Sequence, residues 1–258
     1  MDRPNDRKGL HKAVFRFYKE LNDLIPQKFR KKDFEYTFFG TPSVKDAVEA
    51  IGVPHTEVDL IIVNSRRSVD FSYRIMHGDR IAVYPVFESL DISPVIRLRP
   101  KPLGETRFLA DEHLGKLARL LRLLGFDTLY EPSLSQPDMA AVSHGQKRII
   151  ITRHAAVLKR SDVTRGCLVR SALPEKQVEE IMAKFHLAGS VRPFTRCMSC
   201  NGILVQRNKQ DIAHGLQPGT RKHYDHFLQC EVCGKLYWKG SHYTRLASFV
   251  EKITNLDF

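Results

Sequence analysis

The chain has 258 residues, of which 42% are hydrophobic and 27% charged, a composition that suits packed cores in a protein surrounded by water. Lys and Arg outnumber Asp and Glu by 41 to 29, and the formal net charge of +12 favours a polyanionic partner such as nucleic acid. No run of about 18 apolar residues occurs and the first residues are polar, which disfavours a membrane span, a membrane partner and a secretory signal.

The first part of the chain predicts a small α+β domain over residues 13–88. Residues 1–12 are polar and charged and are expected to be disordered. The predicted elements are a strand at 13–17, a strand at 34–39, a helix at 43–52 that Ser43 caps, and strands at 59–64 and 80–86. The HGDRIAVYPV ending resembles the β-grasp of the ubiquitin-like sulfur carriers. Those carriers need a terminal Gly-Gly, whereas this segment runs on, so a binding module with a protein partner is the better interpretation.

The pattern changes after residues 88–104, which hold three prolines and are predicted to be a linker. From there strands and helices alternate. The predicted strands are 107–111, 127–131, 148–153 and 167–171, and the helices are 114–126, 138–145 and 174–187. This alternation predicts an α/β domain with a mostly parallel sheet between helices, which binds ligands at the carboxyl ends of its strands.

Two CxxC pairs follow, Cys197 with Cys200 and Cys230 with Cys233. Each pair can place two thiolates on one tight turn, or knuckle, so the four are predicted to hold one structural zinc ion in a ribbon over residues 193–250. A redox disulfide pair and an iron–sulfur cluster are the alternatives. Cysteines used in this way fit a reducing compartment, so a cytoplasmic location is expected.

Acidic and basic side chains meet after the first strand of the predicted parallel sheet. Asp111 and Glu112 could hold Mg²⁺ or Mn²⁺ through oxygen, although acids are also favoured at a helix N-terminus. The next helix carries Lys116, Arg119 and Arg122 at i, i+3 and i+6. This stripe is either a solvated outer face or a surface that contacts RNA phosphates. Residues 101–258 hold 24 bases and 15 acids, so an anionic partner is expected to meet this part.

A resemblance becomes specific over residues 107–246. FLADEHLGKLARLLRLLGFDTLY, then RIIITRH, LVRS, RCMSCNGIL and CEVCGKLYWKGSHYTRL, resemble the Mut-seven C-terminal RNase family, whose fold is similar to that of PIN-domain nucleases. Some members carry a ubiquitin-like domain in front, in agreement with residues 13–88. The resemblance implies a PIN-like RNase domain over residues 105–190, between the β-grasp and the zinc ribbon.

The resemblance also implies a carboxylate cluster that binds a divalent metal ion and directs water onto an RNA phosphodiester. Asp111 would be the first ligand, with Glu112 beside it, and Asp138 falls near a second acidic position. His154 occupies the third acidic position, after Thr-Arg at the end of the third strand. Histidine brings no negative charge and suits Mn²⁺ better than Mg²⁺. Arg153 remains beside it and could contact a phosphate.

Three functions compete on these observations. One is a metal-dependent ribonuclease, the second is a non-catalytic RNA-binding protein that keeps the PIN-like fold, and the third is an adaptor that binds proteins through the β-grasp surface. The acids and the basic helix favour the first two, and His154 is the feature that separates them. We expect the ribonuclease, with RNA as its partner.

Overall fold

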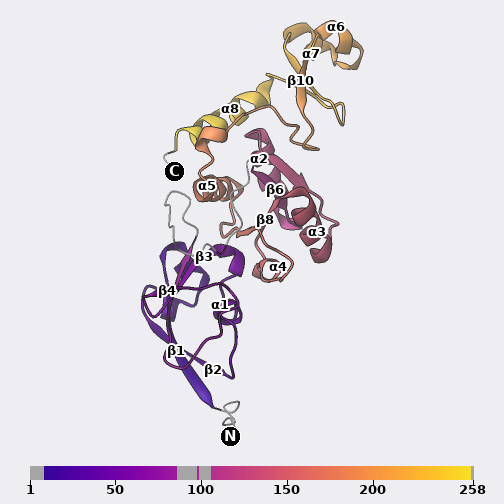
Figure 1. Cartoon of the computed structure of the whole chain (residues 1–258). Coiled ribbons are helices and arrows are strands. Elements are labelled where there is room, and N and C mark those ends of the chain that lie inside the picture. Colours follow the sequence, from indigo (N-terminus) through magenta and orange to yellow (C-terminus); the bar gives the residue numbers. More distant parts are fainter. Residues whose placement is uncertain (1–8, 86–97, 99–105, 257–258) are drawn as a thin grey trace. The chain divides into compact units, whose positions relative to one another are not determined.

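The computed structural model describes residues 9–85, 98 and 106–256 (Figure 1). The described residues form two compact units, the first made by 9–85 and Leu98 with Ser143–Gly145 and His154–Leu168, and the second by the remaining described residues. The predicted linker at 88–104 lies outside the described residues apart from Leu98. Across the described ranges, no helix combines the length and the apolar character that a bilayer crossing requires.

The first unit is built on a five-stranded sheet with the order β2-β1-β5-β3-β4. Its strands are β1 (Leu10–Phe17), β2 (Phe34–Phe39), β3 (Val58–Val63), β4 (Arg67–Ser68) and β5 (Arg80–Pro85). The central strands β1 and β5 run parallel, and every other neighbouring pair is antiparallel. This arrangement with one main helix confirms the predicted β-grasp.

That helix, α1 (Val44–Ile51), forms where its sequence predicts. The Ser43 hydroxyl accepts a hydrogen bond from the Asp46 backbone N–H, and the Asp46 carboxylate accepts one from the Ser43 N–H, so each end of this capping box satisfies the other. Val44 and Val48 are buried. They belong to the core of this unit, whose large members include Phe15, Phe17, Leu21, Ile25, Ile61 and Val83.

The start of β1 departs from expectation. The strand begins at Leu10, so residues 10–12, expected to be disordered, are paired with β2 instead, with Leu10 opposite Phe39. Lys12 also forms an ion pair with Glu35 across the two strands at 2.9 Å. Leu10 and Lys12 are exposed on this strand, and a segment with so little burial gives no strong apolar pattern in the sequence. Two short 3₁₀ helices, η2 (Lys19–Leu24) and η3 (Gln27–Phe29), occupy the predicted loop that follows.

The segment His154–Leu168 packs in the first unit. It contains the short helix α4 (Ala155–Leu158), which was not predicted, and the strand β9 (Gly166–Leu168), a shortened form of the predicted fourth strand. The Lys159 ammonium donates to the Glu49 backbone oxygen at 2.6 Å, and the Leu168 N–H donates to the Glu57 carboxylate at 2.7 Å.

The second unit contains the predicted parallel sheet, with β6 between β7 and β8. Its strands are β6 (Arg107–Ala110), β7 (Asp127–Tyr130) and β8 (Ile149–Thr152). The flanking helices are η5 (Glu112–Leu114), α2 (Gly115–Leu123), α3 (Gln136–Gln146), α5 (Pro174–Lys184) and η6 (Ala188–Ser190). Phe108 and Leu109 of the central strand are fully buried, as expected for a sheet covered on both faces.

Helix α2 buries one leucine face and ends at Leu123, two residues before Gly125, within the predicted range of 114–126. Leu117 and Leu121 are fully buried. Gly125 has a φ of +97°, and a Cβ at this position would lie 2.1 Å from the Arg192 carbonyl oxygen. The Arg192 N–H in turn donates to the Leu124 carbonyl at 2.9 Å. Only glycine permits this close approach, which brings the chain that enters the ribbon against the end of α2.

The cysteine-containing part forms an antiparallel sheet with the order β10-β11-β12. Its strands are β10 (Leu204–Arg207), β11 (Phe227–Cys230) and β12 (Leu236–Trp238). Four helices that were not predicted accompany it, namely α6 (Lys209–Ile212), η7 (Ala213–Gly215), α7 (Pro218–His223) and α8 (Ser241–Thr254). The first three fill the long spacer between the two cysteine pairs.

Candidate functional site

The four predicted cysteines converge, with all Sγ atoms within 4.8 Å of one another. The Sγ atoms of Cys197 and Cys233 are 3.7 Å apart, and those of Cys200 and Cys230 are 3.4 Å apart. Zn–S bonds of about 2.3 Å in a tetrahedron place sulfurs roughly 3.8 Å apart, close to these separations. All four are free thiols, so the group can hold a metal ion.

Hydrogen bonds already favour a thiolate in this cluster. Burial raises the pKa of Cys197, but hydrogen bonds with the Tyr237 hydroxyl and with backbone N–H groups outweigh it and lower the pKa to about 6. The Tyr237 oxygen lies 3.1 Å from the Cys197 sulfur. Burial raises the pKa of Cys200 to about 12. A metal ion therefore has to displace protons from part of the cluster, which makes its affinity depend on pH.

Arg122 links α2 to the first cysteine knuckle. Its guanidinium donates to the Thr128 carbonyl at 2.9 Å and to the Met198 and Ser199 carbonyls at 3.2 and 2.9 Å. The side chain is buried, which departs from the predicted solvent-facing stripe. Burial lowers the pKa of Arg122, against the opposing effect of the Cys200 and Cys197 charges. The reason for the departure is that the knuckle covers this position of the helix.

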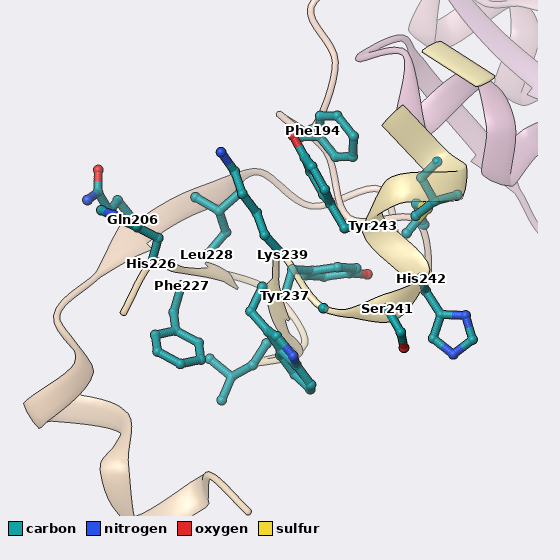
Figure 2. Close-up of a pocket in the computed structure, with 15 residues that line it drawn as sticks. Phe194, Gln206, His226, Phe227, Leu228, Tyr237, Lys239, Ser241, His242 and Tyr243 are labelled. Carbon is teal, nitrogen blue, oxygen red and sulfur yellow. The ribbon is translucent and has the colours of Figure 1, made fainter. Parts of the chain in front are cut away.

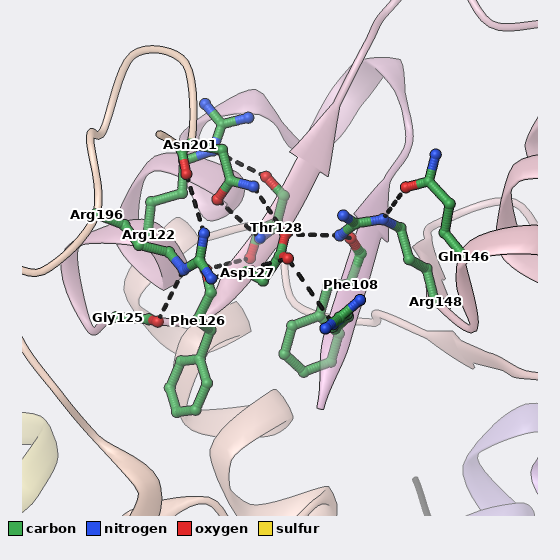
Figure 3. A network of polar contacts seen from close by, with 11 residues as sticks. Phe108, Arg122, Gly125, Phe126, Asp127, Thr128, Gln146, Arg148, Arg196 and Asn201 are labelled. Atoms are coloured by element: carbon green, nitrogen blue, oxygen red, sulfur yellow. Dashed lines mark hydrogen bonds and ion pairs between the residues drawn. The ribbon is translucent and has the colours of Figure 1, made fainter. Parts of the chain in front are cut away.

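Asp127 and Asn201 strengthen the same connection (Figure 3). The Asp127 carboxylate accepts hydrogen bonds from the Arg148 guanidinium and the Asn201 amide, each at 2.7 Å. The Asn201 side-chain oxygen accepts from the Thr128 N–H at 3.0 Å. Burial raises the pKa of Asp127, but these two hydrogen bonds and the charges of Arg148 and Arg196 outweigh it and lower the pKa.

Asp111 directly follows β6, and most of the hydrogen-bonding positions of its carboxylate are occupied by neighbouring groups of the protein. One oxygen accepts from the Thr152 hydroxyl and from the Arg153 N–H, the latter at 3.2 Å, and the other oxygen accepts from the His113 N–H at 3.0 Å. A carboxylate offers about four lone-pair positions, so roughly one remains. The side chain is buried, and its neighbour Glu112 is exposed.

A cavity of about 770 Å³ lies within the second unit, and Glu112 is among its lining residues. Six charged side chains line it, namely Glu112, Lys116, Arg119, Arg122, Arg153 and Lys235. We call it the basic cavity. It brings together the four residues predicted to contact RNA, of which Lys116, Arg119 and Arg153 are exposed. Gly115 and Tyr130 also line the cavity, and a Cβ on Gly115 would lie 2.8 Å from the Tyr130 hydroxyl.

Asp138 and His154 are not among the residues that line the basic cavity. Asp138 is exposed in the first turn of α3, where its carboxylate accepts from the Ser135 hydroxyl at 2.5 Å. His154 is exposed at the N-terminus of α4, in the first unit. Among the described residues, the four cysteines are the only group of three or more Cys, His, Asp or Glu side chains placed to share one ion. The predicted carboxylates do not form a second such group.

Sequence reasoning missed Lys235 and the connection around Asp127. The Lys235 ammonium donates to the Ser199 hydroxyl at 2.9 Å, from one knuckle to the other, at the edge of the basic cavity. The sequence indicates Lys235 only by its place two residues after Cys233, beyond the long segment that separates the two cysteine pairs. Asp127 gave no signal, because an acid at the start of a strand is ordinary.

Two family models match the chain. The Mut7-C RNAse domain matches residues 106–250, which contain the four cysteines, Asp111 and the basic cavity, and the Mut7-C ubiquitin domain matches residues 10–91, which contain the five-stranded sheet. No curated protein and no solved structure gives a significant match. The first match covers more than half of the chain, so the protein belongs to the Mut7-C RNase family and carries an N-terminal ubiquitin-like domain.

Proposed function

We propose that the protein is a metal-dependent ribonuclease that hydrolyses RNA phosphodiester bonds at the basic cavity. The observation that carries this proposal is the placement of the exposed bases Lys116, Arg119 and Arg153 around a cavity that Glu112 also lines. Bases neutralise the phosphates of an RNA backbone, while a carboxylate beside them offers oxygen to a divalent ion. The match to the RNAse domain supports the same substrate class.

The protein ligands for a catalytic ion would be few. Mg²⁺ is commonly held by one or two carboxylates together with substrate phosphates and water, without a complete set of protein ligands. Asp111 retains roughly one lone-pair position, and Glu112 is exposed next to it. A bound Mg²⁺ or Mn²⁺ would supply an activated water and neutralise phosphate charge. Asp138 and His154 are proposed as further contributors, and the nitrogen of His154 would favour Mn²⁺.

The chain's own residues would divide the remaining work. Lys116 and Arg119, one turn apart on α2, would bind neighbouring phosphates of the RNA strand. Thr152 and Arg153 both donate hydrogen bonds to the Asp111 carboxylate, and these bonds would hold the Arg153 side chain near Asp111. The four cysteines are proposed to hold zinc, which would fix the knuckle that closes the basic cavity.

A second candidate is an RNA-binding protein that does not cleave. The described acids do not gather into a group of three, and His154 stands where the family pattern implies an acid. Both observations favour weak or absent catalysis with retained phosphate binding. A protein partner for the ubiquitin-like domain and a cytoplasmic location also remain proposals.

Cleavage of labelled RNA by purified protein tests the proposal. The reaction is run without added divalent ion and with Mg²⁺ or Mn²⁺ restored, while the zinc content is checked throughout. We expect cleavage to need an added ion, to be faster with Mn²⁺, and to be lost in Glu112→Gln and Asp111→Asn. Glu112→Gln is the cleaner variant, because Glu112 is exposed and Asp111 is buried. RNA binding without cleavage under either ion would establish the second candidate.

A further inference from the structure

A second cavity, of about 580 Å³, lies on the ribbon, and five Phe, Tyr and Trp side chains contribute to its lining (Figure 2). Its rings come from three places in the second unit: Phe194 before the first cysteine, Phe227, Tyr237 and Trp238 on the sheet, and Tyr243 in α8. We call it the aromatic cavity. Its volume falls in the range of about 300–1,000 Å³ typical of small-ligand pockets.

The aromatic rings differ in how exposed they are and in what they contact. Phe227 is buried beneath Trp238, with ring centroids 6.4 Å apart, whereas Trp238 remains 39% exposed. Phe194 and Tyr243 pair at 5.1 Å on another side. The hydroxyl of Tyr237 is engaged with the cysteine cluster, so its ring is held in place. The cavity therefore offers one partly exposed indole ring among aromatic side chains that are packed or hydrogen-bonded.

Positive charge accompanies this apolar lining. The Lys239 ammonium lies 5.5 Å from the centre of the Tyr243 ring, and both residues line the aromatic cavity. His226 and His242 line it as well, and both are exposed. No acidic side chain is among the lining residues that the structure describes. This lining suits a planar, electron-rich group attached to an anion.

The aromatic cavity and the basic cavity share a wall. Met198, inside the first cysteine knuckle, lines both of them. The next residue, Ser199, lines the basic cavity and accepts a hydrogen bond from Lys235, which lines it too. A strand with its phosphates in the basic cavity therefore needs only to pass this knuckle for one of its bases to reach the aromatic rings.

We propose that the aromatic cavity binds one unstacked base of the RNA strand whose phosphates occupy the basic cavity. The inference rests on the RNA-binding half of the proposed function and adds a base-binding position to it. Stacking on aromatic side chains accepts any base, because each base has a π face. The cavity would thus fix the position of the strand relative to Glu112 and would not select its sequence.

Trp238 is the only tryptophan of the chain and it lines the aromatic cavity, so its fluorescence should respond to an occupant of that cavity. The probes are a short single-stranded RNA and a ribose-phosphate oligomer of equal length without bases, both without added divalent ion so that neither is cleaved. We expect the RNA to change the Trp238 emission and the abasic oligomer to leave it unchanged. Losing one stacked base weakens binding by about 5- to 150-fold, so the RNA should bind tighter than the abasic oligomer by a factor in this range.

Variants measured with end-labelled probes separate stacking from charge. Trp238→Ala should lower RNA affinity by that factor and leave abasic binding unchanged, while Trp238→Phe should keep most of the affinity. Lys116→Ala should weaken both probes equally. Val232→Ala is the matched control, because Val232 is 74% exposed on the second knuckle and lines neither cavity.

Equal affinity for the two probes, with an unchanged Trp238 emission, would overturn the base-binding position while leaving phosphate binding intact. The aromatic cavity would then belong to a protein or small-molecule occupant. Failure of both probes to bind would refute the proposed RNA function, and with it this inference.

Discussion

Replacement of Arg122 by methionine tests how the cysteine knuckle is held against α2. Methionine keeps most of the side-chain volume and packing but removes every donor. Three backbone carbonyls, those of Thr128, Met198 and Ser199, would lose a buried charged partner. Two of the three belong to the knuckle, so the change should loosen the metal site from the parallel sheet as well as destabilise the unit.

The magnitude follows from these contacts. A hydrogen bond to a charged donor contributes about 1.5–3 kcal/mol, and three such bonds are lost. Part of this loss is offset because the guanidinium no longer has to be desolvated and because water can reach the knuckle carbonyls. We therefore expect the free energy of unfolding to fall by about 2–4 kcal/mol, which shifts the unfolding equilibrium by roughly 30- to 700-fold.

Urea unfolding of metal-loaded protein, followed by Trp238 fluorescence, measures the loss. The rate at which a chelator removes the metal should rise in parallel, because metal binding and local folding are coupled. Arg119→Met is the matched control one turn earlier on α2, where the side chain is exposed. Its stability should stay within about 0.5 kcal/mol of the wild-type value. An Arg122→Met protein as stable as Arg119→Met, with unchanged metal release, would refute this account of the knuckle.

Four other expectations concern single sites. Gly125→Ala should lower the free energy of unfolding by at least about 2 kcal/mol, because Gly125 has a positive φ and the new Cβ would lie 2.1 Å from a carbonyl oxygen. Gly145→Ala is the control, because Gly145 lies in open space within α3, and it should stabilise the protein slightly. Equal melting temperatures of the two variants would contradict this expectation. Because the pKa of Asp127 is lowered by folding, its stabilisation is fully present above the unfolded pKa of about 3.9 and is lost as the pH falls through the folded pKa. The stability gap between wild type and Asp127→Asn, read from urea midpoints, should therefore be wide at pH 7 and close in acid; a gap independent of pH would exclude this origin. Elemental analysis should find one zinc per chain, and iron or no metal would reject the zinc assignment. His154→Asp should raise Mg²⁺-supported RNA cleavage, and an unchanged rate would remove His154 from the metal site.

Local signals in the sequence were sufficient for several elements. The capping pair around α1, the leucine periodicity of α2 with its terminal glycine, and the CxxC spacing each depend on neighbours within a few residues. Because such features are determined by residues close together in the sequence, their location could be predicted. The parallel sheet followed from the alternation of strands and helices.

Features that depend on distant partners were not accessible in the same way. Arg122 shares its spacing with Lys116 and Arg119, and only the arrival of a knuckle some 76 residues later makes it a buried residue. The hydrogen bonds that Asp111 accepts from Thr152 and Arg153, 41 and 42 residues later, were hidden for the same reason. Helices α6 and α7, between the two cysteine pairs, have only 4 and 6 residues, too few for a periodic pattern of apolar residues to indicate them.

The hydrogen bonds between the first cysteine knuckle and Arg122 of α2 have a consequence for the evolution of such chains. A zinc ribbon that is tethered only by a linker can be exchanged between proteins by recombination. Here the Asn201 amide donates to Asp127 of β7, and the Met198 and Ser199 carbonyls accept from Arg122. The Arg192 carbonyl also lies close to Gly125. A ribbon from another protein would lack the residues that make these contacts. We expect the ribbon and the parallel sheet of this family to be duplicated, transferred and lost as one hereditary piece, whatever domain is joined in front of them.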